Sequence, residues 1–247
     1  MVAVLAAPRG GEPRRFYAGF ALTCAVVSVL GFMPTFWLPL ATGRLELTPL
    51  VATHAALFWG WLAFFIAQTT LAASGRFDHH RALGMLGVMT AGAMLVVGWM
   101  TAITSYHVQS AAGHAARAGP FLIAGLTNIV FFAGAVALAA MNHRRPEVHK
   151  RLMVLATVSV IAPALGRAVQ FLVGAGPIEP PPIQATIVPA LLTDLLLVAA
   201  IVHDWRTRGR PHAVYVVRGA LLVLLQVGRI PAALTPGWAS IVDWLTG

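Results

Sequence analysis

The feature that most constrains this chain is a series of long, uncharged, apolar segments that recurs along almost its whole length. A helix that crosses a membrane needs roughly 20 apolar residues, because the hydrocarbon core is about 30 Å thick. Seven segments meet this requirement, at about residues 16–40, 50–73, 82–105, 120–141, 152–174, 183–203 and 214–234. The sequence therefore predicts an all-α, polytopic membrane helix bundle, with residues 1–247 forming one domain.

Composition excludes a soluble domain and argues against a nucleic-acid partner. Only 10% of the residues are charged and 58% are hydrophobic, whereas soluble domains carry about 25% charged residues. The net charge of +9 comes from arginines in short segments between the apolar runs. Such a placement is typical of contacts with anionic lipid headgroups. We therefore expect the chain to contact a lipid bilayer and to bind no nucleic acid.

The basic residues fall on alternate connections, which predicts the orientation. The first apolar segment is longer than the core of a signal peptide, so we interpret it as a retained helix. Four connecting or terminal segments are rich in basic residues, namely Arg9, Arg14 and Arg15; Arg76 and Arg81; Arg144, Arg145, Lys150 and Arg151; Arg206, Arg208 and Arg210. Cytoplasmic loops carry an excess of Lys and Arg. The pattern predicts a bacterial inner-membrane, multi-pass protein with its N-terminus inside and its C-terminus outside.

One set of polar residues is predicted near the external ends of the spans. Ionisable groups within membrane segments are costly and usually face the bundle interior, so each is a functional candidate. The set comprises His54, His107, Arg167, Gln170 and Arg229, with Asn128 somewhat deeper. Arginines without a carboxylate at their depth imply an anionic partner or a water-filled cavity. An alternative is that Arg167 pairs with Asp194 while Arg229 extends to the surface.

The second predicted span carries a stripe of rings on one helix face. Its members recur at intervals of three and four residues, which is the helical period: His54, Phe58, Trp61, Phe65 and Gln68. A stripe of smaller side chains follows the fifth predicted span: Ala156, Val160, Pro163 and Arg167. A flat apolar cofactor would fit between two such faces. Ordinary helix packing explains the same pattern, because small residues let helices approach closely.

Histidines gather at the predicted cytoplasmic face. Six of the nine lie there: His79, His80, His143, His149, His203 and His212. Imidazole binds iron, copper and zinc, so a histidine-ligated metal is one interpretation. The spacings differ from the HxxxH and HxxHH patterns of membrane di-iron hydroxylases, and plain interfacial histidines are the alternative. No phosphate-binding loop, GxSxG elbow or other catalytic constellation is apparent, so no catalytic residue is assigned.

Three short motifs resemble those of a loose group of bacterial multi-span proteins. They are "HAALFWGWLAFFIAQ" from His54, "HHRALG" from His79 and "HKRLM" from His149, followed by Arg167. The group includes uncharacterised families and others linked with terminal-oxidase or haem-protein assembly. The resemblance implies a redox or haem-related role, carried onto His54, His80 and His149. No helix carries two histidines about fourteen residues apart, as in b-type membrane cytochromes, so we expect at most one haem.

Our leading hypothesis is a redox-linked membrane protein that binds haem b or a quinone-like cofactor within the bundle. It would serve as an accessory or assembly component of a respiratory complex, with other membrane subunits or quinone as partners. His54 and His107 are the candidate axial ligands. The second hypothesis is a metalloenzyme that acts on lipid through iron or another metal at the inner histidines. The third is a small-anion transporter or channel that uses Arg167 and Arg229.

Overall fold

The computed structural model describes residues 15–174 and 179–247, and in these ranges it contains helices and no strand. The helices are α1 (Arg15–Gly31), α2 (Leu38–Ala41), α3 (Pro49–Ala73), α4 (Phe77–Ala111), α5 (Ala115–Met141), α6 (Pro146–Ser159), α7 (Ala162–Leu172), α8 (Ile187–Arg208), α9 (Ala213–Ala233) and α10 (Pro236–Thr246). A π-helical turn, Met33–Trp37, precedes α2, and a 3₁₀ turn, Ile183–Thr186, precedes α8. The all-α prediction is confirmed.

The helices are long and apolar enough for a multi-pass membrane protein. Six helical segments are long and apolar enough to cross a membrane. They are α3, α4, α5, α6 joined with α7, the 3₁₀ turn joined with α8, and α9. The first predicted span is bent by 52° between α1 and the segment Met33–Ala41. Pro34 lies in the π-helical turn just after the bend, and a proline cannot donate a backbone hydrogen bond. Counting this bent pair as one span gives the seven that the sequence predicts.

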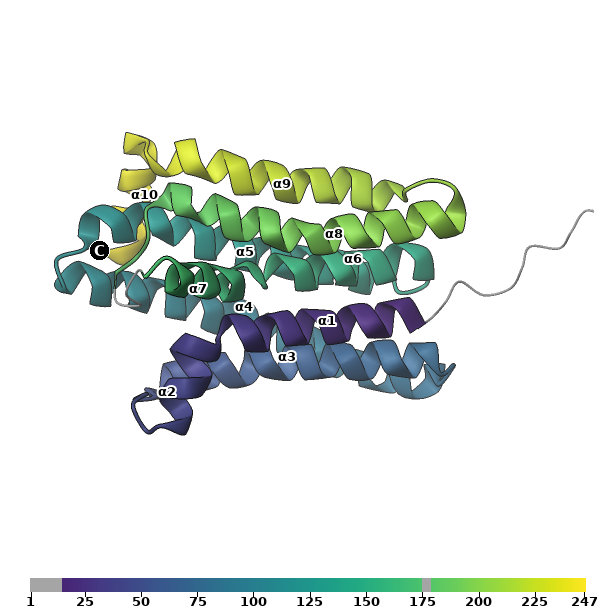
Figure 1. The fold of residues 1–247 in the computed structure, drawn as a ribbon. Helices are drawn as coiled ribbons and strands as arrows, with labels where there is room; N and C mark the ends of the chain where they lie inside the picture. Colours follow the sequence, from purple (N-terminus) through teal and green to yellow (C-terminus); the bar gives the residue numbers. More distant parts are fainter. Residues whose placement is uncertain (1–14, 175–178) are drawn as a thin grey trace, which may run out of the picture.

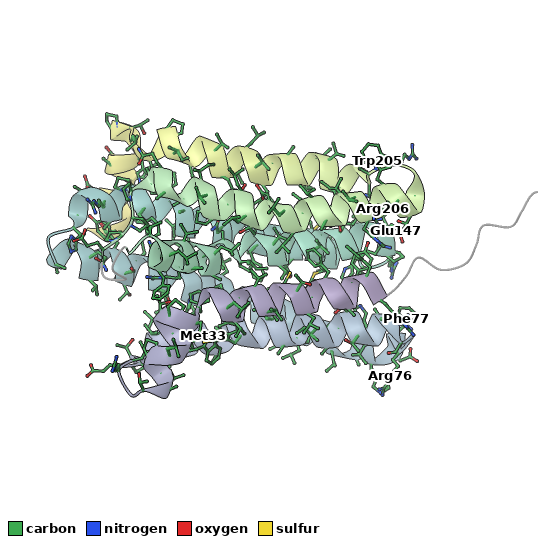
Figure 2. The ribbon with its side chains drawn as sticks, in the orientation of Figure 1. Met33, Arg76, Phe77, Glu147, Trp205 and Arg206 are labelled. Atoms are coloured by element: carbon green, nitrogen blue, oxygen red, sulfur yellow. The ribbon has the colours of Figure 1, made fainter. Side chains whose placement is uncertain are left out.

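Basic residues collect at one end of the bundle. The start of α1 and the turns α3–α4, α5–α6 and α8–α9 all lie at this end, while α2, α10 and the α4–α5 turn lie at the other (Figure 1). Arg76, Glu147 and Arg206 mark the same end among the side chains (Figure 2). We call it the basic end, and the other the cavity end. Arg9 and Arg14 of the predicted basic N-terminus lie outside the described residues.

The fifth predicted span is divided into α6 and α7. Pro163 has no N–H with which to continue the helical ladder to Ser159, and the break falls at Val160–Ile161. The α7 half then packs against α1 at a backbone contact. A Cβ atom on Gly31 would lie 2.5 Å from the Ala164 carbonyl oxygen, so only glycine allows this approach. The break and the contact together position the helix that carries Arg167.

Rings of the α3 stripe form part of the core between the helices. The Trp61 ring stands edge-on to Phe132 of α5, with centroids 4.8 Å apart, and its Nε1 donates a hydrogen bond to Thr157 Oγ1 of α6 at 3.3 Å. The surface that faces away from the core is apolar, as Leu195 and Leu224 illustrate with exposures of 62% and 68%. An exposed apolar belt of this kind suits lipid contact.

Candidate ligand-binding cavity

A cavity of about 870 Å³ lies at the cavity end of the bundle. The members of the predicted outer set that line it are His54 from α3, Asn128 from α5, Arg167 and Gln170 from α7, and Arg229 from α9, and Phe58 of the ring stripe joins them. Sites for small molecules and cofactors typically enclose about 300–1,000 Å³. The structure therefore brings most of the predicted outer set, drawn from four helices, around one space of ligand size.

The cavity has mainly apolar walls and a charged rim. Its apolar lining includes Phe58, Phe121, Leu122, Ile129, Val160, Pro163, Val169 and Pro182. At the rim, Arg117 Nη1 and Glu179 Oε2 form an ion pair at 2.9 Å, and both side chains are about half exposed. The cavity thus combines an apolar body with a few polar groups at defined points, which is the usual character of a site for an apolar ligand.

Arg229 is buried at the cavity wall, with only 4% of its surface exposed. Its Nη1 donates a hydrogen bond to Asn128 Oδ1 at 3.1 Å. The Nε atom is buried and has no acceptor among residues 15–174 and 179–247. The interpretation that Arg229 extends outward to the surface is therefore wrong, because the side chain turns into the bundle and meets α5.

His54 is held by stacking on its own helix. Its ring lies nearly parallel to that of Phe58, four residues later, with centroids 4.2 Å apart and planes inclined by 24°. The Nδ1 atom is buried and has no hydrogen-bond partner within the part of the chain that the structure describes. A neutral imidazole has one donor and one acceptor nitrogen, so His54 still offers hydrogen-bonding or ligating capacity in the cavity wall.

Arg167 and Asp194 belong to different surroundings. Arg167 lines the cavity with an exposed side chain. Asp194, which the sequence suggests as its possible partner, accepts a hydrogen bond on Oδ1 from Gln226 Nε2 of α9 at 3.2 Å. Asp194 and Gln226 are both buried. Asp194 of α8 is therefore hydrogen-bonded to the side-chain amide of Gln226 on α9.

The inner half of the α3 stripe does not reach the cavity. Trp61, Phe65 and Gln68 are buried in the core and are absent from the cavity lining. The stripe is therefore divided: its outer members face the cavity, and of its inner members Trp61 contacts α5 and α6. For these three residues, the packing alternative describes the structure better than the cofactor interpretation.

His107 lies near the cavity but does not line it. The sequence suggests a loop after residue 105, whereas α4 continues to Ala111. Each residue turns an α-helix by about 100°, so Tyr106 and Gln109 line the cavity while His107 is exposed. Sequence reasoning missed Ser105, Tyr106 and Gln109. The signal was present as a face of small and polar residues at helical spacing: Gly98, Thr101, Ala102, Ser105 and Gln109.

The inner histidines are spread over several environments. His80 and His149 approach one another, with ring centroids 6.2 Å apart, and His203 stacks on Phe16 at 3.7 Å. His143 contacts the Ala140 carbonyl oxygen through Nδ1 at 2.8 Å, and His79 is exposed. Within residues 15–174 and 179–247, no three histidine, cysteine or carboxylate side chains are grouped to hold a metal ion.

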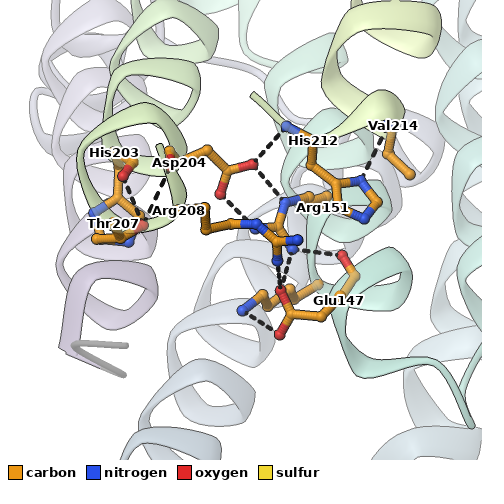
Figure 3. Close-up of polar contacts among 9 residues, drawn as sticks. Glu147, Arg151, His203, Asp204, Thr207, Arg208, His212 and Val214 are labelled. Carbon is orange, nitrogen blue, oxygen red and sulfur yellow. Dashed lines mark hydrogen bonds and ion pairs between the residues drawn. The ribbon is translucent and has the colours of Figure 1, made fainter. Parts of the chain in front are cut away.

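The basic end contains a charged network that the sequence analysis did not identify (Figure 3). Arg151 of α6 and Asp204 of α8 are both fully buried and form a two-point ion pair, with Arg151 Nε donating to Asp204 Oδ2 at 2.7 Å. Arg151 Nη1 also donates to Glu147 Oε2 at 2.7 Å. Glu147 pairs with Arg208 as well, and the His212 backbone N–H donates to Asp204 Oδ2 at 3.1 Å. The local signals were the i, i+4 spacing of Glu147 and Arg151 and the i, i+3 spacing of Glu147 and Lys150.

Comparison with known protein families, with curated proteins and with solved structures finds no match for this chain.

Proposed function

We propose that this protein is a redox-linked membrane protein that binds one haem, or a quinone-like cofactor, in the cavity. The observation that supports this proposal is that His54, Arg167 and Arg229, from three different helices, line one space. A histidine, cationic side chains and an apolar wall are the groups that hold a haem in a protein. The protein would act as an accessory or assembly component of a respiratory complex.

The cavity residues fit a haem held by one histidine. The His54 imidazole would ligate the iron, Phe58 would fix the ring orientation through its stacking contact, and Arg167 with Arg229 would bind the carboxylates. A bound haem supplies one-electron chemistry. The protein would supply the apolar walls, which lower the local polarity, and the cations that offset the negative charge of the carboxylates. His107 does not line the cavity, so it is not placed to act as a second axial ligand.

An absorption spectrum of the purified protein tests this proposal. We expect a Soret band in the natural protein and its loss in His54→Ala, since this variant removes the ligand. His107→Ala is the matched control, because His107 is exposed and lies outside the cavity lining, and it should keep the band. A protein that shows no Soret band and yields quinone on solvent extraction would select the quinone alternative. If neither group is present, the proposed function fails.

We also propose that the basic end faces the cytoplasm of a bacterial inner membrane. Arg76 and Arg206 of the turns lie at that end (Figure 2), and cytoplasmic loops carry an excess of basic residues. A reporter inserted beside Arg208 should be located in the cytoplasm, and a reporter fused after Gly247 should be located on the external side. A cytoplasmic C-terminal reporter would reverse the assignment of the cavity to the external side.

A further inference from the structure

Arg229 is the most incompletely satisfied charge in the part of the chain that the structure describes around the cavity. Its guanidinium group has five N–H donors. Within residues 15–174 and 179–247, only the Nη1 contact with Asn128 gives one of them an acceptor. The residue is 4% exposed, so bulk solvent compensates little of this deficit. A charge in such a position is costly unless something pairs with it.

The residues around Arg229 supply no counter-charge by hydrogen bonding. Its described partner, Asn128, is a neutral amide. The Asp194 carboxyl group accepts a hydrogen bond from Gln226, which lies on α9 one helical turn before Arg229. Glu179 forms an ion pair with Arg117. Neither of these two carboxylates forms an ion pair with Arg229, which itself lines the cavity.

We propose that Arg229 and Asn128 form an anion-recognition site for an acidic group, a carboxylate or a phosphate, carried on the apolar body of the cavity ligand. The inference rests on the proposed function and narrows its ligand class. The planar guanidinium fork matches such groups through paired hydrogen bonds, and an anion supplies the negative charge that a water molecule lacks. Asn128 holds the guanidinium in place, since its Oδ1 fixes Nη1.

This assignment separates the two cofactor classes of the proposed function. Haem carries two carboxylates, whereas a quinone is neutral and offers no partner for a buried cation. The same acidic chemistry occurs in anionic lipids, whose acyl chains would suit the apolar walls. The shared requirement is an acidic group joined to an apolar body, and the two sources are distinguished by separate probes.

The experiment compares matched acidic and neutral probes on the protein purified in a non-ionic detergent. Haem and haem dimethyl ester differ only in their carboxylates, and both are followed by absorbance titration. Phosphatidylglycerol and diacylglycerol with identical acyl chains form the lipid pair, followed by native mass spectrometry. We expect the natural protein to prefer one acidic probe over its neutral counterpart by about ten- to hundred-fold, the usual effect of a hydrogen bond to a charged group.

Arg229→Gln should reduce that preference to near one, and Arg229→Lys should restore part of it, because lysine keeps the charge but not the fork. Arg218→Gln is the matched control: Arg218 lies on the same helix and does not line this cavity. Asn128→Asp is a second variant that does not depend on losing the arginine. It gives Arg229 an internal carboxylate, so it should raise thermal stability and lower the affinity for the acidic probe.

The outcomes distinguish the two proposals. If haem and its ester bind equally well and the lipid pair shows no preference either, the anion-recognition inference is overturned while the proposed haem function stands. If neither porphyrin binds, the haem function fails and the lipid pair decides: a preference for phosphatidylglycerol that Arg229→Gln abolishes supports anion recognition by a lipid headgroup. No preference in either pair, or a preference that survives in both Arg229→Gln and Asn128→Asp, overturns the inference.

Discussion

Each end of the bundle contains a buried arginine, and the two arginines differ in the charge of the groups that they contact. At the basic end, Arg151 is fully buried and meets two carboxylates, Asp204 and Glu147. At the cavity end, Arg229 is almost as buried but has one described acceptor, the amide of Asn128. The first arginine is neutralised within the protein and lies in a packed helix junction. The second lines an open space of about 870 Å³.

The contrast distinguishes a structural charge from a ligand-binding one. A buried ion pair in which each charge meets its counter-charge joins α6, α8 and the start of α9, so the arginine there needs no anionic ligand. A buried cation with unused donors keeps its capacity for an external anion. Burial alone therefore does not identify a binding residue in this bundle. The number of N–H donors that lack an acceptor distinguishes Arg229 from Arg151.

The largest expected effect comes from breaking the basic-end pair. Arg151→Gln leaves the Asp204 carboxylate buried without its cation, and removing one partner of a buried pair costs about 3–5 kcal/mol. Arg229→Gln should be neutral or stabilising in the ligand-free protein, because it removes a buried charge whose one described acceptor is a neutral amide. Unfolding in mixtures of a mild detergent and dodecyl sulfate would measure both free energies. Similar losses in the two variants would remove the contrast between the ends.

A smaller loss of stability is expected when the close contact between α1 and α7 at the cavity end is disturbed. Gly31→Ala places a Cβ atom 2.5 Å from the Ala164 carbonyl oxygen and must push α7 away from α1. We expect a loss of about 1–3 kcal/mol in the free energy of unfolding, as for other overpacked contacts. It should be accompanied by weaker binding of the cavity ligand, because α7 carries Arg167.

Gly19→Ala is the matched control for this contact. Gly19 lies in the same helix, and an added Cβ there meets no atom within 4 Å, so the change should be neutral or stabilising by up to about 1 kcal/mol. If Gly31→Ala unfolds and binds like the natural protein, the α1–α7 contact does not position the cavity.

The smallest expected effect is a pH dependence at the basic end. Burial lowers the pKa of His212 below its ordinary value of 6.5, and the positive charges of Arg151 and Arg208 lower it further, against the opposing effect of Asp204 and Glu147. The unfolded chain then binds more protons than the folded one as the pH falls. The stabilising contribution is complete above pH 6.5 and is lost as the pH decreases toward the lowered pKa.

Unfolding measured at a series of pH values tests this dependence. His212 Nδ1 accepts the Val214 N–H at the start of α9, and asparagine caps helices well without titrating. His212→Asn should therefore flatten the dependence below pH 6.5 while keeping the cap. A slope that is the same in both proteins would assign the pH effect to another group.

The depth of the polar residues followed from the order of the sequence. Hydropathy gives the length of each apolar segment, and a helix rises about 1.5 Å per residue, so His54, Arg167 and Arg229 fall at one end of their spans whatever the packing. The gathering of arginines such as Arg76 and Arg206 at the other end follows from the same alternation. These are local properties of single segments, and the structure agrees with each of them.

The pairing of side chains was decided by the tertiary structure. Arg151 meets Asp204, 53 residues away, and Arg229 meets Asn128, 101 residues away. Such contacts depend on which face each helix turns toward its neighbours, and hydropathy does not encode that rotation in a segment that is apolar on all sides. The same rotation excludes His107 from the cavity and includes Gln109, two residues later. The sequence by itself determined the membrane bundle and the depth of its polar groups, because those depend on segment length and charge order; only helix packing determined which of those groups meet.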